Sequence, residues 1–146
     1  ESNNNRQYTV MSYTGSSYGE PITPMVYDIA ALQYMYGANT SYHTGDDTYS
    51  WGANAVVYET IWDAGGNDTL SAVDQASAVT LYLTSGKYSQ IGKAYNNVRD
   101  TLTIGFGATV ENAIGSAFND TIEGNLVANT LDGGAGNDRL DGNSAE

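Results

Sequence analysis

Residues 115–142 read GSAFNDTIE, GNLVANTLD, GGAGNDRLD and G, three nine-residue units that each begin with glycine. Six residues of each unit suit a tight turn, because glycine adopts positive φ and can turn backbone carbonyls inward. The Asp or Asn in sixth place adds a side-chain oxygen, and Ca²⁺ takes about six to eight oxygen ligands. The remaining three residues suit a short strand whose middle side chain, Ile122, Leu131 or Leu140, points into a core. The repeat therefore predicts stacked calcium-binding turns joined by small strands, which a Gly/Asn-rich linker would not form.

A degenerate copy of the unit lies upstream, in WDAGGNDTL at residues 62–70. Asp63 and Asp68 are five residues apart around two glycines, a spacing that lets both carboxylates reach one ion across a turn. The HTGDD segment that begins at His43 offers further carbonyls and carboxylates. We expect the His43 imidazole itself to be exposed and idle, because one histidine makes no zinc site. Glu111 is interpreted either as a calcium ligand beside the first repeat turn or as a strand-edge carboxylate with no functional role.

Only residues 24–36 have convincing helical periodicity. Thr23 suits the N-cap, Pro24 the first helical position, and Gly37 follows the end. Apolar residues recur along one face, which we expect to be buried core. They are Met25, Val26, Ile29, Ala30, Leu32 and Tyr36. Short β-rich runs separated by turn signals follow, at residues 56–61, 79–83 and 102–104. The chain is therefore expected to be mainly β after a boundary near residue 40.

The composition favours cations as partners. Five basic residues stand against seventeen acidic ones, and the formal net charge is −12. This balance argues against nucleic acid and anionic membrane surfaces, and no apolar run is long enough to span a membrane. Binding of about four Ca²⁺ ions would cancel roughly eight negative charges. The chain contains no cysteine, so calcium would have to provide the stabilisation that disulfides give many secreted proteins.

Folding of the repeats is expected to depend on calcium. Each unit buries one aliphatic side chain, which contributes about 1.5–3 kcal/mol. Ordering nine residues costs roughly 1–2 kcal/mol of backbone entropy per residue. Extracellular calcium sites bind at about 10⁻⁴–10⁻³ M, so millimolar calcium adds on the order of 1 kcal/mol per site. We therefore expect the repeats to be disordered in calcium-poor cytosol and to fold outside the cell.

Taken together, the motifs resemble the C-terminal portion of serralysins. These are secreted bacterial zinc metallopeptidases of the metzincin group, peptidase family M10, with a C-terminal calcium β-roll of RTX repeats. The matching motifs, in order and at similar spacing, are MSY at residues 11–13, the helix ending in QYMYGAN, WDAGGNDTL, TVENAIG and the nonapeptides. The resemblance implies a mainly β fold, a right-handed parallel β-roll preceded by a Met-turn and one α-helix. Residues 1–40 would be the end of the catalytic domain, and residues 41–146 a calcium β-roll truncated at its C-terminus.

The resemblance also assigns functional residues. Met11 would be the Met-turn methionine, and Tyr13 the tyrosine that reaches the catalytic zinc and stabilises the tetrahedral intermediate in the full enzyme. One calcium ion would lie between His43, Gly45, Asp47 and Asp63, Gly65, Asp68. A second would use Gly66, Asp68, Thr109 and Glu111. The roll ions would use Ser116, Phe118 and Asp120; then Asn125, Val127 and Asn129; then Gly133, Gly134, Ala135, Gly136 and Asp138. His43, Thr109, Ser116, Phe118, Val127 and Ala135 would act through backbone carbonyls.

Two residues depart from the family pattern. Phe118 replaces a usual glycine, and a side chain there would strain any positive-φ conformation. Asn129 replaces the usual aspartate and lowers the ligand charge, although asparagine tolerates such turns. We therefore expect the middle roll site to be the weakest.

The metzincin zinc motif HExxHxxGxxH does not occur in these 146 residues. We therefore interpret the chain as the C-terminal part of a secreted serralysin-like zinc metalloendopeptidase, exported by a type I system and inactive alone. It would bind several Ca²⁺ ions. Zn²⁺ and protein substrates would bind only with the N-terminal catalytic portion, as part of the same chain or as a separate one. Alternatives are a stand-alone RTX module for secretion or interaction, or the calcium module of another secreted enzyme such as a polysaccharide epimerase or a lipase. The Met-turn and the helix favour the first interpretation.

Overall fold

The computed structural model describes residues 5–12, 20–95 and 98–143. Within these ranges the chain contains one helix and ten strands, so the expectation of a mainly β fold is confirmed. The helix is α1 (Val26–Tyr36). The strands are β1 (Thr48–Ser50), β2 (Glu59–Ile61), β3 (Thr69–Ser71), β4 (Thr80–Tyr82), β5 (Tyr88–Tyr95), β6 (Val98–Ile104), β7 (Asn112–Ile114), β8 (Thr121–Glu123), β9 (Thr130–Asp132) and β10 (Arg139–Asp141).

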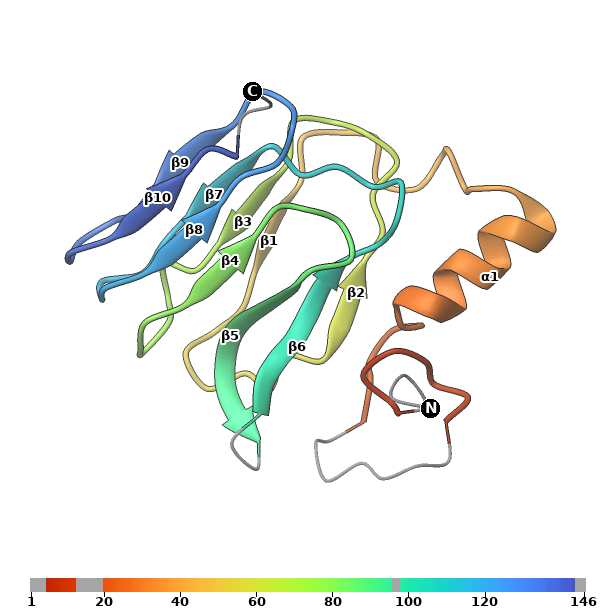
Figure 1. The fold of residues 1–146 in the computed structure, drawn as a ribbon, viewed down its shortest axis with the longest axis horizontal. Helices are drawn as coiled ribbons and strands as arrows, with labels where there is room; N and C mark the ends of the chain where they lie inside the picture. The colour runs from red at the N-terminus through yellow and green to blue at the C-terminus, as the bar shows by residue number, and fades with distance from the viewer. Residues whose placement is uncertain (1–4, 13–19, 96–97, 144–146) are drawn as a thin grey trace.

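The strands form two sheets, with the orders β1-β3-β7-β9 and β10-β8-β4-β5-β6-β2. Figure 1 shows them as two layers, and from β7 to β10 consecutive strands alternate between the layers. All pairs are parallel except those that involve β5, which pairs antiparallel with β4 and β6. Ala113 pairs with Leu131, and Thr121 with Arg139. Both pairs are eighteen residues apart, so two nine-residue units bring the chain back to the same sheet.

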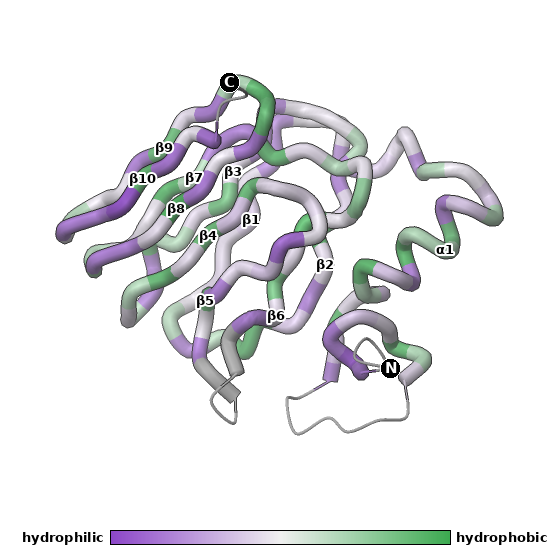
Figure 2. The backbone as a smooth tube through the Cα atoms, viewed as in Figure 1, coloured by the Kyte–Doolittle hydropathy of each residue, from purple (hydrophilic) through white to green (hydrophobic). Residues whose placement is uncertain are grey.

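The apolar core lies where the middle residues of the short strands meet. Leu70, Leu81 and Ile122 are fully buried there. Leu131 is only half-buried, and Leu140 is 46% exposed. The prediction of a core position is therefore wrong for Leu140. The reason is its place in the sheet, because β10 is an edge strand that pairs with β8 alone among the described strands. Hydrophilic residues predominate along β10 and the turn before it (Figure 2).

The predicted helix is confirmed, with a later start than 24–36. Met25 is the N-cap, and its backbone N–H donates to Oδ2 of Asp28 over 2.9 Å. Thr23 was predicted to be the N-cap, and this is wrong, because its hydroxyl oxygen accepts the backbone N–H of Thr60 in β2 over 2.8 Å. Thr23 is therefore attached to the edge strand of the second sheet rather than to the start of the helix.

Only the start of α1 is buried, at the N-cap and the first helical residue. Met25 and Val26 are 0% and 2% exposed, whereas Leu32 and Tyr36 are 46% and 80% exposed. The prediction that the whole apolar face is core is therefore wrong for the C-terminal half of the helix. Figure 1 shows α1 beside β2, at the end of the molecule opposite β9 and β10. Its later turns extend beyond the sheets and leave these side chains at the surface.

The segment before α1 is fastened to both the helix and the sheet. Asp28 accepts hydrogen bonds from Oγ1 of Thr9 (2.6 Å) and from the backbone N–H of Val10 (2.8 Å). The hydroxyl of Tyr88 donates to the carbonyl of Gln7 over 2.7 Å. Met11, the expected Met-turn methionine, is 73% exposed in this structure. Among the described residues, no helix has the length and apolarity needed to cross a bilayer.

Candidate metal centres

The predicted calcium ligands lie in turns that immediately precede strands. His43, Gly45 and Asp47 precede β1; Asp63, Gly65, Gly66 and Asp68 precede β3; Thr109 and Glu111 precede β7; Ser116, Phe118 and Asp120 precede β8; Asn125, Val127 and Asn129 precede β9; Gly133, Gly134, Ala135, Gly136 and Asp138 precede β10. Tyr13 lies outside the described residues. Because partner strands are parallel and in register, the turns before them stack on one another. We call the space between two stacked turns an interturn site and name it by one residue from each turn.

Close approach of the turns requires glycine at two positions. A Cβ atom on Gly66 would lie 2.1 Å from the carbonyl oxygen of Gly45, and one on Gly134 would lie 2.3 Å from that of Ser116. Both distances are too short for any side chain. The glycines of the repeat therefore allow the carbonyl oxygens of one turn to approach the next turn directly.

The Asp47–Asp68 site brings together three potential metal-binding side chains. Ligand atoms of His43, Asp47 and Asp63 all lie within 4.8 Å of one another. Nδ1 of His43 is 2.8 Å from Oδ2 of Asp47. Asp63 is almost fully buried; its Oδ2 accepts from the Tyr49 hydroxyl over 2.5 Å and its Oδ1 from the Gly65 N–H over 2.8 Å. The expectation of an exposed, idle His43 imidazole is wrong, because the ring is half-buried and hydrogen-bonded to Asp47.

Tyr49 is a residue of this site that the sequence analysis missed. Its ring centroid lies 5.9 Å from that of His43. Burial, and next the hydrogen bond to Asp63, raise the pKa of its hydroxyl. The available signal was position, because Tyr49 is the middle residue of β1, directly after the HTGDD turn.

Asp68 provides the clearest sign of a missing partner. The residue is 0% exposed, and its Oδ1 accepts the backbone N–H of Asp47 over 2.8 Å. Its Oδ2 is buried and has no hydrogen-bond partner among the described residues. Burial raises the pKa of Asp68; the N–H of Asp47 opposes this shift, and the carboxylates of Asp63 and Glu111 add to it. A divalent cation fits here, since it would give the orphaned oxygen a partner and compensate the neighbouring charges.

The same arrangement continues into the next interturn site. The backbone N–H of Asp68 donates to Oε2 of Glu111 over 2.8 Å. The turns that precede β4, β8 and β10 of the second sheet are linked in the same way. The N–H of Val79 donates to Oδ1 of Asp120 (2.7 Å), and that of Asp120 donates to Oδ1 of Asp138 (2.9 Å). In each case a carboxylate of the later turn accepts from the earlier turn.

These carboxylates have few positive partners. Within the part of the chain that the structure describes, the lysine and arginine ion pairs are Arg6–Glu20, Lys87–Glu123 and Arg139–Asp141. None of them involves the turns' buried carboxylates at Asp63, Asp68 or Asp120. Such a donor set, composed of carboxylates and backbone carbonyls, suits a hard divalent cation such as Ca²⁺.

The two departures from the repeat have different outcomes. Among the described non-glycine residues, only His43 and Asn143 have positive φ, so Phe118 is accommodated without the anticipated strain. Asn129 behaves differently from the aspartates at equivalent positions. Its Nδ2 donates to the carbonyl of Glu111 over 3.0 Å and to Oδ1 of Asn125 over 2.8 Å.

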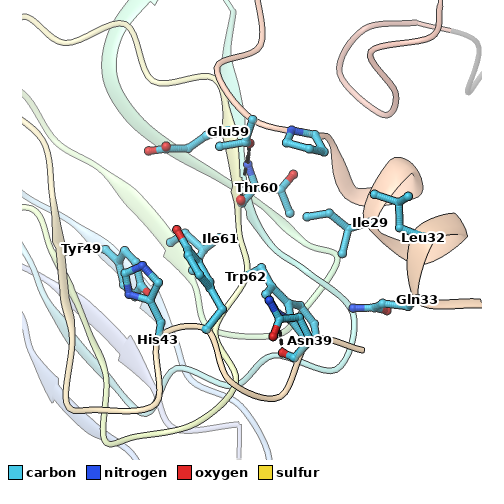
Figure 3. Close-up of a pocket in the computed structure, with 13 residues that line it drawn as sticks. Ile29, Leu32, Gln33, Asn39, His43, Tyr49, Glu59, Thr60, Ile61 and Trp62 are labelled. Carbon is cyan, nitrogen blue, oxygen red and sulfur yellow. Dashed lines mark hydrogen bonds between the residues drawn. The ribbon is translucent and has the colours of Figure 1, made fainter. Parts of the chain in front are cut away.

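A largely apolar pocket of about 390 Å³ lies between α1 and β2. Figure 3 shows Ile29 and Leu32 of the helix on one side and Trp62 below them, with His43 and Tyr49 at the opposite end. Its acidic lining residue is Glu59, whose pKa is raised by burial although the Trp51 indole N–H donates to it. The pocket therefore adjoins the Asp47–Asp68 site through His43 and Tyr49.

Known proteins resemble this chain over most of its length. Residues 27–144 match the family described as Peptidase M10 serralysin C terminal. The chain is 39% identical to a serralysin of Proteus mirabilis over 145 residues, which cover 86% of this chain and 29% of that protein. It is 36% identical to serralysin G of Dickeya chrysanthemi, with 87% and 30% covered, and to the metallopeptidase AprA of Pseudomonas marginalis, with 90% and 28% covered. The chain thus spans less than a third of the length of these relatives.

Proposed function

Because this chain belongs to the serralysin family, we propose that it is the calcium-binding C-terminal part of a secreted, serralysin-like zinc metalloendopeptidase. The observation that carries the calcium proposal is the buried, unpartnered Oδ2 of Asp68. Asp63 and Glu111 approach the same turn, and both raise the pKa of Asp68. A divalent cation would compensate the repulsion among these carboxylates and so stabilise the stacked turns.

The proposed fold is a right-handed parallel β-roll over residues 41–146, preceded by residues 1–40 from the end of the catalytic domain. Parallel pairing of strands eighteen residues apart supports this proposal. The proposed ion sites are the Asp47–Asp68, Asp68–Glu111 and Asp120–Asp138 sites, with backbone carbonyls as additional ligands. The Asn129 turn is the weakest candidate.

Bound calcium would act as a structural cross-link between turns. The chain's own residues prepare for it in two ways. Backbone N–H groups, such as those of Asp47 and Asp68, fix one oxygen of each carboxylate. Glycines bring the carbonyls of the neighbouring turn close. Calcium-dependent folding would allow export as an unfolded chain, and we propose type I export and an extracellular location on that basis.

The peptidase assignment concerns a longer protein. Catalytic zinc would be held by the N-terminal portion, which supplies the HExxHxxGxxH motif, and Tyr13 of this chain would reach toward it. Proteins would be the substrates of the combined enzyme. The gene sequence upstream of Glu1 provides the test: this motif shortly upstream supports the proposal, and an unrelated upstream domain or none would favour a stand-alone module or another secreted enzyme.

Calcium binding is tested directly by thermal unfolding followed by circular dichroism. We expect the melting temperature of the purified chain to rise with calcium concentration and to fall after chelation, while magnesium at the same ionic strength has little effect. Aspartate-to-asparagine exchange at Asp74, which is exposed, provides a matched control that should leave the calcium response intact. A β signal and melting temperature unchanged by chelator would refute the proposal.

A further inference from the structure

We infer that the Glu111–Asn129 interturn site is closed by two asparagine amides and takes no ion, unlike its carboxylate-based neighbours. The inference rests on the proposed calcium function and specifies which sites carry it. It concerns a difference between turns that are otherwise equivalent in sequence position. Asn129 occupies the place that Asp120 and Asp138 occupy in the units before and after it.

The orientation of the Asn129 amide is set by its own turn. The backbone N–H of Asn125 donates to Oδ1 of Asn129 over 2.9 Å, as the backbone N–H of Ser116 donates to Oδ2 of Asp120. The amide oxygen must face this donor, because an NH₂ group there would oppose the N–H. The second substituent therefore points toward the neighbouring turn. In aspartate it is an oxygen, whereas in Asn129 it is the NH₂ group.

The oxygens around this amide already have hydrogen-bond donors. The Glu111 carbonyl accepts from Nδ2 of Asn129 over 3.0 Å and from the backbone N–H of Thr130 over 3.3 Å. Oδ1 of Asn125 accepts from the same Nδ2 over 2.8 Å. The Val110 carbonyl accepts from Nδ2 of Asn125 over 2.9 Å. An entering cation would have to displace these donors from the oxygens that it needs.

The charge at this site is also low. The carboxylate of Glu111 points to the other side of its turn, where its Oε2 accepts the N–H of Asp68. The Asn129 turn supplies two neutral amides, while the Asp47–Asp68 site contains three carboxylates, from Asp47, Asp63 and Asp68. Without repulsion to relieve, a cation gains little here. The two amides perform the bridging that ions are proposed to perform elsewhere in the stack.

The test counts bound calcium in the wild-type chain and three variants, by equilibrium dialysis with radioactive calcium at saturation. Asn129→Asp keeps the oxygen that faces the Asn125 N–H and replaces the NH₂ group with a second oxygen. We expect it to bind one ion more than the wild type. Asn129→Ala should bind the same number as the wild type, while its melting temperature in chelator falls because the amide bridge is lost. Asp120→Asn should bind at least one ion fewer.

The outcomes separate the inference from the proposed function. Loss of one ion in Asn129→Ala, or an unchanged count in a folded Asn129→Asp, would overturn the inference while the calcium function stands. If the wild type binds no calcium and Asp120→Asn changes nothing, the proposed function fails and the inference fails with it. Should Asn129→Asp not fold, the count for Asn129→Ala still decides.

Discussion

Replacing Asp68 with asparagine should change stability in opposite directions with and without calcium. In chelator, the variant removes a buried charge whose Oδ2 lacks a partner, while the remaining amide oxygen still accepts the N–H of Asp47. The neutral amide removes the repulsion from the carboxylates of Asp63 and Glu111, and a buried polar or charged group without a partner costs about 1–3 kcal/mol or more. We therefore expect Asp68→Asn to be more stable than the wild type by an amount of this order when calcium is absent.

In calcium the same change should destabilise the chain. At about 10 mM calcium and a Kd near 10⁻⁴ M, each site adds about 2.7 kcal/mol to the free energy of unfolding. Asp68 adjoins two proposed sites, so the loss could approach about 5 kcal/mol if both fail. With roughly 3 °C per kcal/mol for a domain of this size, the melting temperature would fall by about 10–15 °C.

The assay is thermal and urea unfolding of wild type and variant, each in chelator and in calcium. Asp74→Asn is the matched control, because it removes the same charge at an exposed position. The reasoning is refuted if Asp68→Asn is destabilised equally in both media. That result would mean that the carboxylate stabilises the fold independently of calcium.

Three further perturbations test the packing and the electrostatics. In chelator, the free energy of unfolding should fall as pH rises above 3.8, the ordinary pKa of Asp68, because its raised pKa lets the folded state keep a proton that the unfolded chain releases. Urea unfolding between about pH 4 and pH 7 measures this fall. The same dependence of stability on pH in Asp68→Asn would contradict the prediction. Gly66→Ala should cost about 1–3 kcal/mol or more, because its Cβ would lie 2.1 Å from a carbonyl oxygen, whereas Gly45→Ala meets open space and should stay within about 0.5 kcal/mol. Equal unfolding midpoints for these two variants would argue against close stacking of the turns. Leu81→Ala, at a fully buried position, should cost about 2–5 kcal/mol in urea unfolding, and Leu126→Ala, 73% exposed, less than about 0.5 kcal/mol; comparable losses would place the core elsewhere.

The period of the repeat explains how much could be predicted. Glycine spacing and an aliphatic residue at the eighth position of each nine-residue unit are local signals, and they predicted the strands β8, β9 and β10 directly. They also predicted the buried position of Ile122. Leu140 has the same local signal but an edge position, and strand order is a long-range property that the repeat does not encode.

The candidate site shows the same division. The acidic residues Asp63 and Asp68 were predicted from spacing, because their turn brings both side chains to one region. The role of Tyr49 was not predicted, since it depends on a hydrogen bond to Asp63, fourteen residues further along the chain. The contact of the His43 ring with Asp47 lies within the HTGDD turn itself, and residue spacing alone does not show which side chains of a turn meet. The exposure of the C-terminal half of α1 has a similar cause. Periodicity identifies an apolar face, but only the surrounding chain determines whether Leu32 is covered.

The hydrogen bonds between turns give the stack a polarity. In the carboxylate sites, the donor is the backbone of the earlier turn and the acceptor is the side chain of the later one. A later turn therefore depends on its predecessor for the orientation of its carboxylate, while the predecessor depends less on its successor. Amide hydrogen exchange should accordingly slow from β10 back toward β3. A single backbone cleavage before Asp63 should increase the exchange rate in every turn and strand that follows it.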